Sequence, residues 1–217
     1  MPNLPIFPLH TVLFPGTPIQ LHIFEPRYIQ MVQRCLETNG FFGVSLIEEG
    51  QEALGPLARP FELGCSASIR KVEPLEDGRM ILVAQGIERV RIEEIINTQP
   101  YMTANVTEHP VVGKRDRMLR HSSAALLPLI HRYIELVASD QADELSTFRL
   151  PDEPTTLAYL TGSLLQIPLA EKQSFLAIES AGELIGMAKH MLRREIALQR
   201  VIAERNPAEA IGSFSLN

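Results

Sequence analysis

The residues that could perform chemistry in this chain are scattered, and none of the common catalytic patterns is complete. A phosphate-binding loop needs Gly-x-x-x-x-Gly-Lys-Ser/Thr, in which backbone amides surround the phosphates. The only Gly-Lys pair, Gly113-Lys114, is followed by Arg115. The two cysteines, Cys35 and Cys65, have neither CxxC spacing nor a nearby pair of histidines. The sequence therefore predicts no ATPase, no metal site and no cofactor.

Histidines offer a second place to look for chemistry. The six histidines are dispersed, and only His10 and His22 come close to one another, on either side of a proline-rich turn. Positions across paired strands, or on a solvated rim, are the simplest interpretation of this pair, since no third metal ligand is evident. An enzyme site here would need a deep pocket and a carboxylate that converges on both rings.

A third group of residues is better suited to binding than to catalysis. Glu25 and Arg27 flank Pro26 at the expected start of a helix, where an acidic residue also favours the positive helix end. Phe14 is a candidate for exposure because it lies in a turn, and exposed apolar side chains usually mark interaction sites. The candidate substrate-binding residues are Phe14, Pro15, Glu25, Arg27 and Tyr28.

These candidates lie in a segment that cannot form a long helix. Five prolines stand between short apolar runs within residues 4–28, and proline removes a backbone donor and disfavours helical geometry in the preceding residue. We expect two strands, at residues 4–9 and 19–24, joined by a rigid turn at Phe14-Pro15-Gly16. A helix should then run from Pro26 to about Asn39, followed by Gly40 in the left-handed conformation.

The rest of the first half also predicts short strands. The residue types and their alternation suggest strands at 41–47, 65–72, 80–85, 90–92 and 101–106, and a loop at 50–60. A change of face at Val72 indicates a bulge, and Asp77-Gly78 predicts a tight hairpin with a type I′ turn. Six or so short strands with one helix suggest a small, bent sheet or pseudo-barrel.

From Lys114 onward the apolar periodicity becomes helical. Asp152 is expected to cap one helix, and Ser180 and Glu183 form a capping box that opens the last helix. That helix is roughly 37 Å long and offers a surface to a second copy, so a homodimer is one expectation. The expected helices cover residues 117–139, with a kink or break at Pro128, and 154–165, 169–178 and 181–204.

Composition and charge argue against nucleic-acid and membrane partners. With 217 residues, 45% of them hydrophobic, the chain can bury a substantial core. Residues 1–113 contain 8 basic and 13 acidic residues, a charge of −5 out of −6 for the whole chain, which opposes binding to a phosphate backbone. No run reaches the roughly 18 apolar residues of a membrane span. We therefore expect a cytoplasmic protein with no nucleic-acid or membrane partner.

Several of these motifs together resemble the N-terminal domain of Lon protease, the LON substrate-binding domain family. Phe7-Pro8-Leu9, Leu13-Phe14-Pro15-Gly16 and the run from Ile23 to Tyr28 occur in the order and spacing of that family. Gly86-Ile-Glu-Arg-Val-Arg-Ile92 is similar to its Gly-x-x-Arg strand, and residues 167–176 are similar to its helical part. The resemblance covers most of residues 4–200, without a clear motif in the middle of 45–75 or at 140–155.

The resemblance implies an α+β fold in two modules. An N-terminal PUA-like β pseudo-barrel with one helix would cover residues 1–113, and an all-α bundle with a long final helix would cover 114–205, before a flexible tail at 206–217. It implies non-catalytic recognition of protein substrates or partners, as an accessory to ATP-dependent proteolysis. The partners would be unfolded or damaged polypeptides or a protease-related protein, and we expect apolar and edge-strand contacts in the crevice between the two modules.

The resemblance also raises two questions that the residues answer only in part. Ser180-Ala181-Gly182 is similar to the tripeptide at the Lon nucleophile, but the capping box accounts for it, and we expect no protease dyad because the chain ends before the family's lysine would follow. PUA-like folds elsewhere bind RNA. A nucleic-acid or small-ligand binding module is therefore the alternative function.

Overall fold

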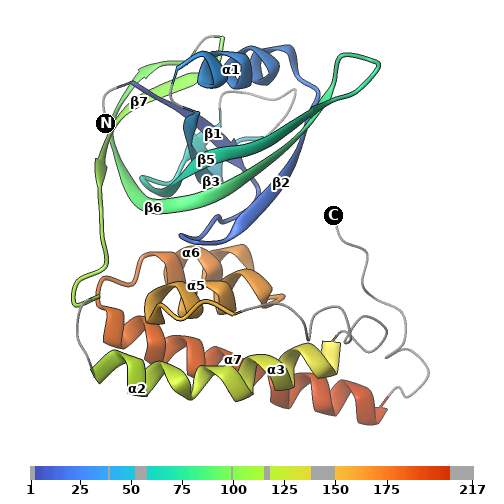
Figure 1. The fold of residues 1–217 in the computed structure, drawn as a ribbon, viewed down its shortest axis with the longest axis vertical. Coiled ribbons are helices and arrows are strands. Elements are labelled where there is room, and N and C mark those ends of the chain that lie inside the picture. Colours follow the sequence, from blue (N-terminus) through green and yellow to red (C-terminus); the bar gives the residue numbers. More distant parts are fainter. Residues whose placement is uncertain are drawn as a thin grey trace. The chain divides into compact units, whose positions relative to one another are not determined.

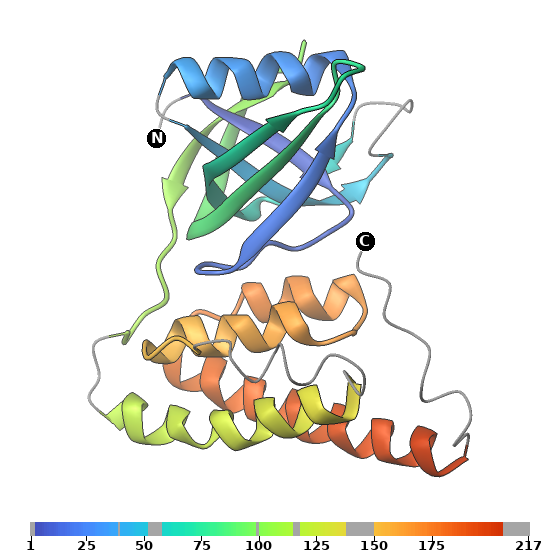
Figure 2. The same ribbon diagram turned by 45° about the vertical axis from the view of Figure 1, so that its right-hand side comes forward.

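The computed structural model describes residues 3–38, 40–51, 58–98, 100–114, 118–137 and 150–205, drawn in Figures 1 and 2. Contacts divide the chain into two compact units: Met1–Val111 with Ile167–Ala177, and Val112–Gln166 with Ile178–Asn217. The α+β class is confirmed, since strands dominate the first unit and helices the second. The expected tail at 206–217 and most of the loop expected at 50–60 lie outside the described residues.

Five strands of the first unit close into a barrel. They are β1 (Leu4–Leu9), β3 (Phe41–Glu49), β5 (Leu63–Pro74), β6 (Met80–Asn97) and β7 (Met102–Glu108). β1 pairs in parallel with β3 and antiparallel with β7, and β5 and β6 complete the circuit between them. Two further strands lie outside this circuit: β2 (Pro18–Ile23) pairs with β6, and β4 (Arg59–Pro60) pairs with β3.

Helix α1 (Pro26–Glu37) packs on the barrel core (Figure 1). Proline at the first helical position needs no backbone donor, and the chain leaves the helix through Gly40 at φ +70°, as expected. Its buried face contains Tyr28, Met31, Val32 and Cys35, whereas Leu36 is 54% exposed. Both cysteines are free and buried. Burial raises the pKa of the Cys35 thiol to about 11 and also raises that of Cys65.

The long strand β6 differs from what the sequence predicted. Residues 80–85 and 90–92 were expected as separate strands, but β6 runs unbroken through Gly86 for 18 residues. The bulge expected near Val72 is confirmed by the register shift between Ile69 and Lys71. The β5–β6 hairpin does not have a type I′ turn, because only Gly78 has a positive φ there and Asp77 does not.

Four helices of the second unit are described: α2 (Met118–Ala124), α3 (Leu126–Val137), α5 (Pro154–Leu164) and α7 (Ala181–Arg205). The expected break near Pro128 is confirmed, between α2 and α3. Ser180 Oγ accepts a hydrogen bond from the Glu183 amide at 3.1 Å, as one half of the expected capping box requires. α7 packs against α3 and α5. Its later residues Leu198 and Ile202 are exposed.

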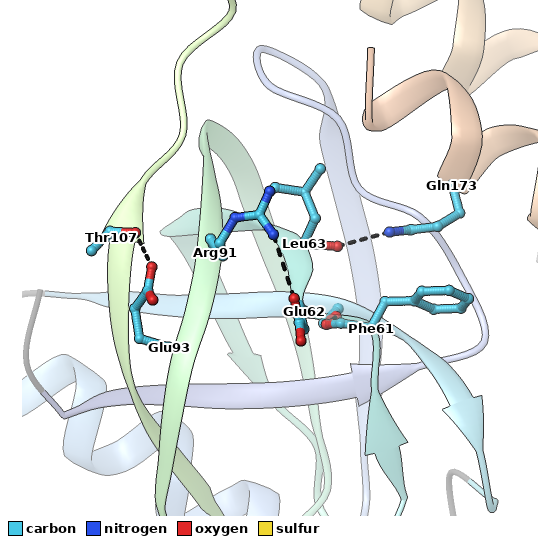
Figure 3. Close-up of polar contacts among 8 residues, drawn as sticks. Phe61, Glu62, Leu63, Arg91, Glu93, Thr107 and Gln173 are labelled. Atoms are coloured by element: carbon cyan, nitrogen blue, oxygen red, sulfur yellow. Dashed lines mark hydrogen bonds and ion pairs between the residues drawn. The ribbon is translucent and has the colours of Figure 1, made fainter. Parts of the chain in front are cut away.

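Helix α6 (Leu169–Leu176) belongs to the first unit, although the sequence placed residues 169–178 in the helical module. Gln173 Nε2 donates to the Leu63 carbonyl at 2.9 Å (Figure 3). Phe175 packs edge-on against Phe14, with 5.9 Å between ring centroids. Buried Arg89 of β6 donates from Nη1 to the Leu176 carbonyl at 2.7 Å. The helix is therefore fixed to the barrel by polar and apolar contacts.

Helix α5 is capped by Glu153 and not by the expected Asp152. Glu153 Oε2 accepts hydrogen bonds from the Thr156 amide at 2.6 Å and from the Thr155 hydroxyl at 2.7 Å. Burial alone would raise the pKa of this carboxyl, but the hydrogen bonds from the two threonines outweigh it and hold the pKa below its usual value.

We expect Glu153→Ala to lower the free energy of unfolding by about 1 kcal/mol at neutral pH, the usual effect of removing a cap. Because the folded-state pKa is depressed, this contribution is present above the unfolded-state pKa and is lost as pH falls through the folded-state value. Urea unfolding at neutral and acidic pH measures both effects. Asp152→Ala is the matched control, and an equal loss in that variant would contradict the assignment of the cap.

Candidate functional site

The candidate site lies at the connection between the end of β2 and the start of α1. β2 ends at Ile23, and Phe24 follows with 54% of its surface exposed. Glu25 occupies the N-cap position in an extended conformation, with φ −77° and ψ 132°. Its carboxylate makes no capping hydrogen bond, and so it is directed to another partner. We call Phe24–Tyr28 the junction segment.

The polar groups of the junction segment hold one another in place. Arg27 Nη2 lies 2.9 Å from Glu25 Oε2, and Arg27 Nε donates to the same oxygen at 3.0 Å. The guanidinium carbon of Arg27 also lies 4.6 Å from the centre of the Tyr28 ring, within the range of a cation–π contact. Tyr28 in turn stacks on Phe7 of β1, with centroids 4.0 Å apart. The Arg27 side chain is thus fixed before any partner binds.

A shallow pocket opens beside Arg27 and Tyr28. It is a shallow depression of about 310 Å³ that includes space open to solvent. The lining comes from β1, the start of α1, the residues flanking the undescribed segment 52–57, the β6–β7 connection and the first residue of β7: Pro8, Arg27, Tyr28, Gln51, Ala58, Thr98, Tyr101 and Met102.

Three of the five residues proposed from the sequence come together here, and two do not. Glu25, Arg27 and Tyr28 lie in the junction segment. Phe14 was a candidate for exposure, but its exposed fraction is 0%, and Pro15 is also buried. The reason is that the turn folds back onto β6, where Gly16 donates a backbone hydrogen bond to the Gly86 carbonyl at 2.8 Å. Phe14 is a core residue.

Of the two expectations for His10 and His22, the solvated rim is confirmed, since both residues are exposed, and the position across paired strands is wrong. His22 lies in β2 opposite Ile81 of β6, whereas His10 follows β1, whose partners are β3 and β7. Over the part of the chain that the structure describes, no cluster of three or more His, Cys, Asp or Glu side chains could hold a metal ion. No helix among those residues is both long and apolar enough to cross a membrane.

Comparison with known proteins identifies the family. The model of the ATP-dependent protease La (LON) substrate-binding domain matches residues 3–194. This chain belongs to that family. The match includes both the strands of the first unit and the helices of the second, which confirms the resemblance that the proline-rich segment suggested. Since the family model describes a substrate-binding domain, the chain is a substrate-recognition module of the Lon type.

The chain is also similar to much longer proteins. It is 24% identical over 197 residues to Lon protease 1 of Herpetosiphon aurantiacus, covering 89% of this chain and 24% of that protein. It is 29% identical over 180 residues to the Lon protease of Syntrophus aciditrophicus, covering 81% and 22%. The chain therefore spans about a quarter of the length of these curated relatives.

Two solved structures share the LON domain fold. A Lon N-terminal domain protein from Xanthomonas campestris superposes with a TM-score of 0.58 at 22% identity, covering 86% of this chain and 96% of that one. The N-terminal domain of the Mycobacterium avium complex Lon protease superposes with a TM-score of 0.65 at 17% identity, covering 88% and 98%. At these identities the likeness concerns the fold alone.

Proposed function

We propose that this LON domain binds unfolded or damaged polypeptides, or a protease-related protein, without catalysis of its own, as an accessory to ATP-dependent proteolysis. The observation that carries the proposal is the junction segment, in which an exposed Phe24 precedes a small pocket with a fixed arginine. Membership of a substrate-binding family supports the same reading.

The proposed site would distinguish unfolded from folded proteins by the apolar side chains that only unfolded chains expose. Folded proteins bury most of their large apolar side chains, so a surface that binds one apolar side chain at a time selects chains that have lost their fold. The shallow depression beside Tyr28 is also lined by Pro8, Tyr101 and Met102, whose apolar surfaces such a side chain can contact. Because Arg27 is already fixed by Glu25 and by the Tyr28 ring, little side-chain entropy is lost when a partner binds.

Fluorescence anisotropy with labelled, reduced and carboxymethylated α-lactalbumin tests the proposal directly. We expect saturable binding with a Kd of roughly micromolar order, and no binding of the native, calcium-bound form of the same protein. Absence of binding up to high micromolar concentration would remove the proposal. A structured RNA should bind weakly in the same buffer, because residues 1–113 carry a charge of −5.

Phe24 and Leu36 form a matched pair for mutagenesis, since each is 54% exposed, Phe24 just before the start of α1 and Leu36 in its last turn. We expect Phe24→Ser to weaken binding of reduced α-lactalbumin about tenfold, which corresponds to about 1.4 kcal/mol, because an aromatic contact is lost. Leu36→Ser should change the Kd by less than about twofold. Equal effects of the two substitutions would show that general surface hydrophobicity, and not the junction segment, governs binding.

A further inference from the structure

The outer edge of β2 is an incomplete part of the sheet. β2 pairs along all six residues with β6, from Pro18 opposite Gln85 to Ile23 opposite Met80, and has no second strand among the described residues. Figures 1 and 2 show it running alongside β6 outside the closed circuit of the barrel. A strand with one unpaired side presents a row of backbone donors and acceptors to any extended chain.

The register shows which residues carry these free backbone groups. Residues of an antiparallel pair alternate between positions that exchange hydrogen bonds with the partner and positions whose groups point away. The Gly86 amide donates to the Thr17 carbonyl at 2.9 Å, so the bonded positions continue at Ile19, Leu21 and Ile23. The N–H and C=O groups of Gln20 and His22 therefore point away from β6, and no described residue supplies a partner for them.

The side chains of β2 indicate what kind of chain fits beside it. Pro18, Gln20 and His22 are exposed, whereas Ile19 and Leu21 are only half-buried although they pack against the barrel core. A neighbouring strand would cover the remaining apolar surface of Ile19 and Leu21 with every second side chain. Its other side chains would lie beside Gln20 and His22 in solvent. The fitting occupant thus has apolar residues at alternate positions.

The other strand outside the barrel circuit does not offer the same opportunity. β4 has only two residues, and Arg59 forms ion pairs with Glu48 at 2.8 Å and Glu49 at 3.3 Å. Short strands and charged side chains are the usual means by which sheet edges are protected from pairing. β2 is three times as long and contains no Asp, Glu, Lys or Arg.

We propose that the free edge of β2 binds an extended segment of polypeptide by strand addition, with apolar side chains at every second position of that segment. The inference rests on the proposed function and names the site and the conformation in which the polypeptide is held. Because β2 leads directly into the junction segment, a chain paired along residues 18–23 extends toward Phe24 and the pocket. Backbone pairing explains how one surface accepts many sequences.

The substitution His22→Pro tests strand addition by removing a single backbone N–H group from the outer edge of β2. Proline removes the outward N–H of this residue while leaving the bonds of Leu21 and Ile23 to β6 in place, and Pro18 already occupies an equivalent outward position in the same strand. His22→Ala is the matched control, because it removes the side chain and keeps the N–H. We expect His22→Pro to weaken binding of reduced α-lactalbumin about tenfold and His22→Ala to weaken it less than about twofold.

A second measurement leaves the protein unchanged, so it applies even where His22→Pro does not fold. The probe is a short peptide of alternating valine and threonine residues flanked by lysines, in versions N-methylated on one or the other alternating set of backbone nitrogens. We expect methylation of at least one set to weaken binding about tenfold, because the donors facing β2 are removed. Equal affinity of all versions would overturn strand addition.

The outcomes separate this inference from the function on which it rests. If the unaltered protein binds reduced α-lactalbumin and both His22 variants bind it equally well, the edge is not the site, but the proposed function stands. If the unaltered protein binds neither probe, the proposed function fails. Sedimentation of the unaltered protein and of His22→Pro adds a third result: a dimer that only the proline variant disrupts would assign the edge to a second copy and overturn the proposal.

Discussion

Replacing Arg89 by methionine is expected to lower the free energy of unfolding of the barrel unit by about 3 kcal/mol. Arg89 is 1% exposed, and its side chain joins three separate parts of the unit. Nε donates to the His109 carbonyl at 2.9 Å, and Nη1 donates to the Leu176 carbonyl at 2.7 Å. Methionine fills a similar volume but leaves the part-buried His109 carbonyl and the buried Leu176 carbonyl without these donors.

The position of Arg89 explains why its effect should concentrate on one helix. Leu176 is the last residue of α6, where the backbone carbonyls lack helical partners and the helix end is partly negative. A guanidinium there supplies both the missing donor and a complementary charge. Hydrogen exchange of α6 should therefore accelerate more in Arg89→Met than exchange of strands on the far side of the barrel.

Arg91 provides the matched control on the same strand. Its Nη1 lies 3.4 Å from Glu62 Oε2 (Figure 3), and the side chains of the pair are 38% and 77% exposed. Exposed ion pairs contribute about 0–1 kcal/mol to stability. The urea midpoint of Arg91→Met should therefore lie close to that of the unaltered protein. Urea unfolding followed by far-UV circular dichroism suits a chain without tryptophan. Equal midpoints for both variants would show that the buried guanidinium does not hold the unit together.

Local rules accounted for the proline-rich beginning of the chain. Proline restricts its own φ and the conformation of the residue before it, so the segment was expected to form strands at 4–9 and 19–24 and a helix from Pro26. The structure has strands at Leu4–Leu9 and Pro18–Ile23 and a helix that begins at Pro26. Gly40 was predictable for the same reason, since only glycine enters the left-handed region at little cost. The family motifs reflect these restrictions, which is why they were recognisable.

The sequence could not show which side chains meet in three dimensions. Helix α6 has helical spacing like its neighbours, and only its contacts with Leu63, Arg89 and Phe14 place it in the barrel unit. The pocket combines Tyr28 with Tyr101, which is 73 positions away in the sequence. No local pattern marks such a pair. Three of the five residues of the junction segment, Glu25, Arg27 and Tyr28, were proposed from residue types alone, but the pocket beside them could be found only from the fold.

Phe14 illustrates a different kind of failure. A phenylalanine in a proline–glycine turn looks exposed when the turn is assumed to face solvent. Here the turn packs inward, because β6 has a glycine at the point of contact and the two backbones approach closely. The signal was present as Gly86 within the strand pattern, since a glycine inside a strand often marks such an approach. It could not indicate which segment of the chain would fill the space.

Gly86→Ala follows from this close approach and should have an effect comparable to that of Arg89→Met. A Cβ atom at residue 86 would overlap the Phe14 carbonyl oxygen and would lie 3.2 Å from Cys65 Sγ. The turn cannot simply move away, because Gly16 donates to the Gly86 carbonyl and the Gly86 amide donates to Thr17. We expect a loss of about 3 kcal/mol in the free energy of unfolding, at the upper end of overpacking effects.

Gly43→Ala is the matched control, because its new Cβ would crowd a side chain, whereas the Cβ of Gly86→Ala would overlap the backbone. A Cβ at residue 43 would lie 2.8 Å from Ile6 Cδ1, the end of a flexible side chain that can rotate, so we expect a loss of about 1 kcal/mol. Gly86→Ala should also accelerate hydrogen exchange in β2, because the bonds of Gly86 to residues 16 and 17 set the register of that strand. Two results together would contradict this assignment: a Gly86→Ala variant as stable as Gly43→Ala, and unchanged amide hydrogen exchange in β2. The turn would then not be anchored at Gly86. The outward direction assigned to the Gln20 and His22 amides would lose its structural basis.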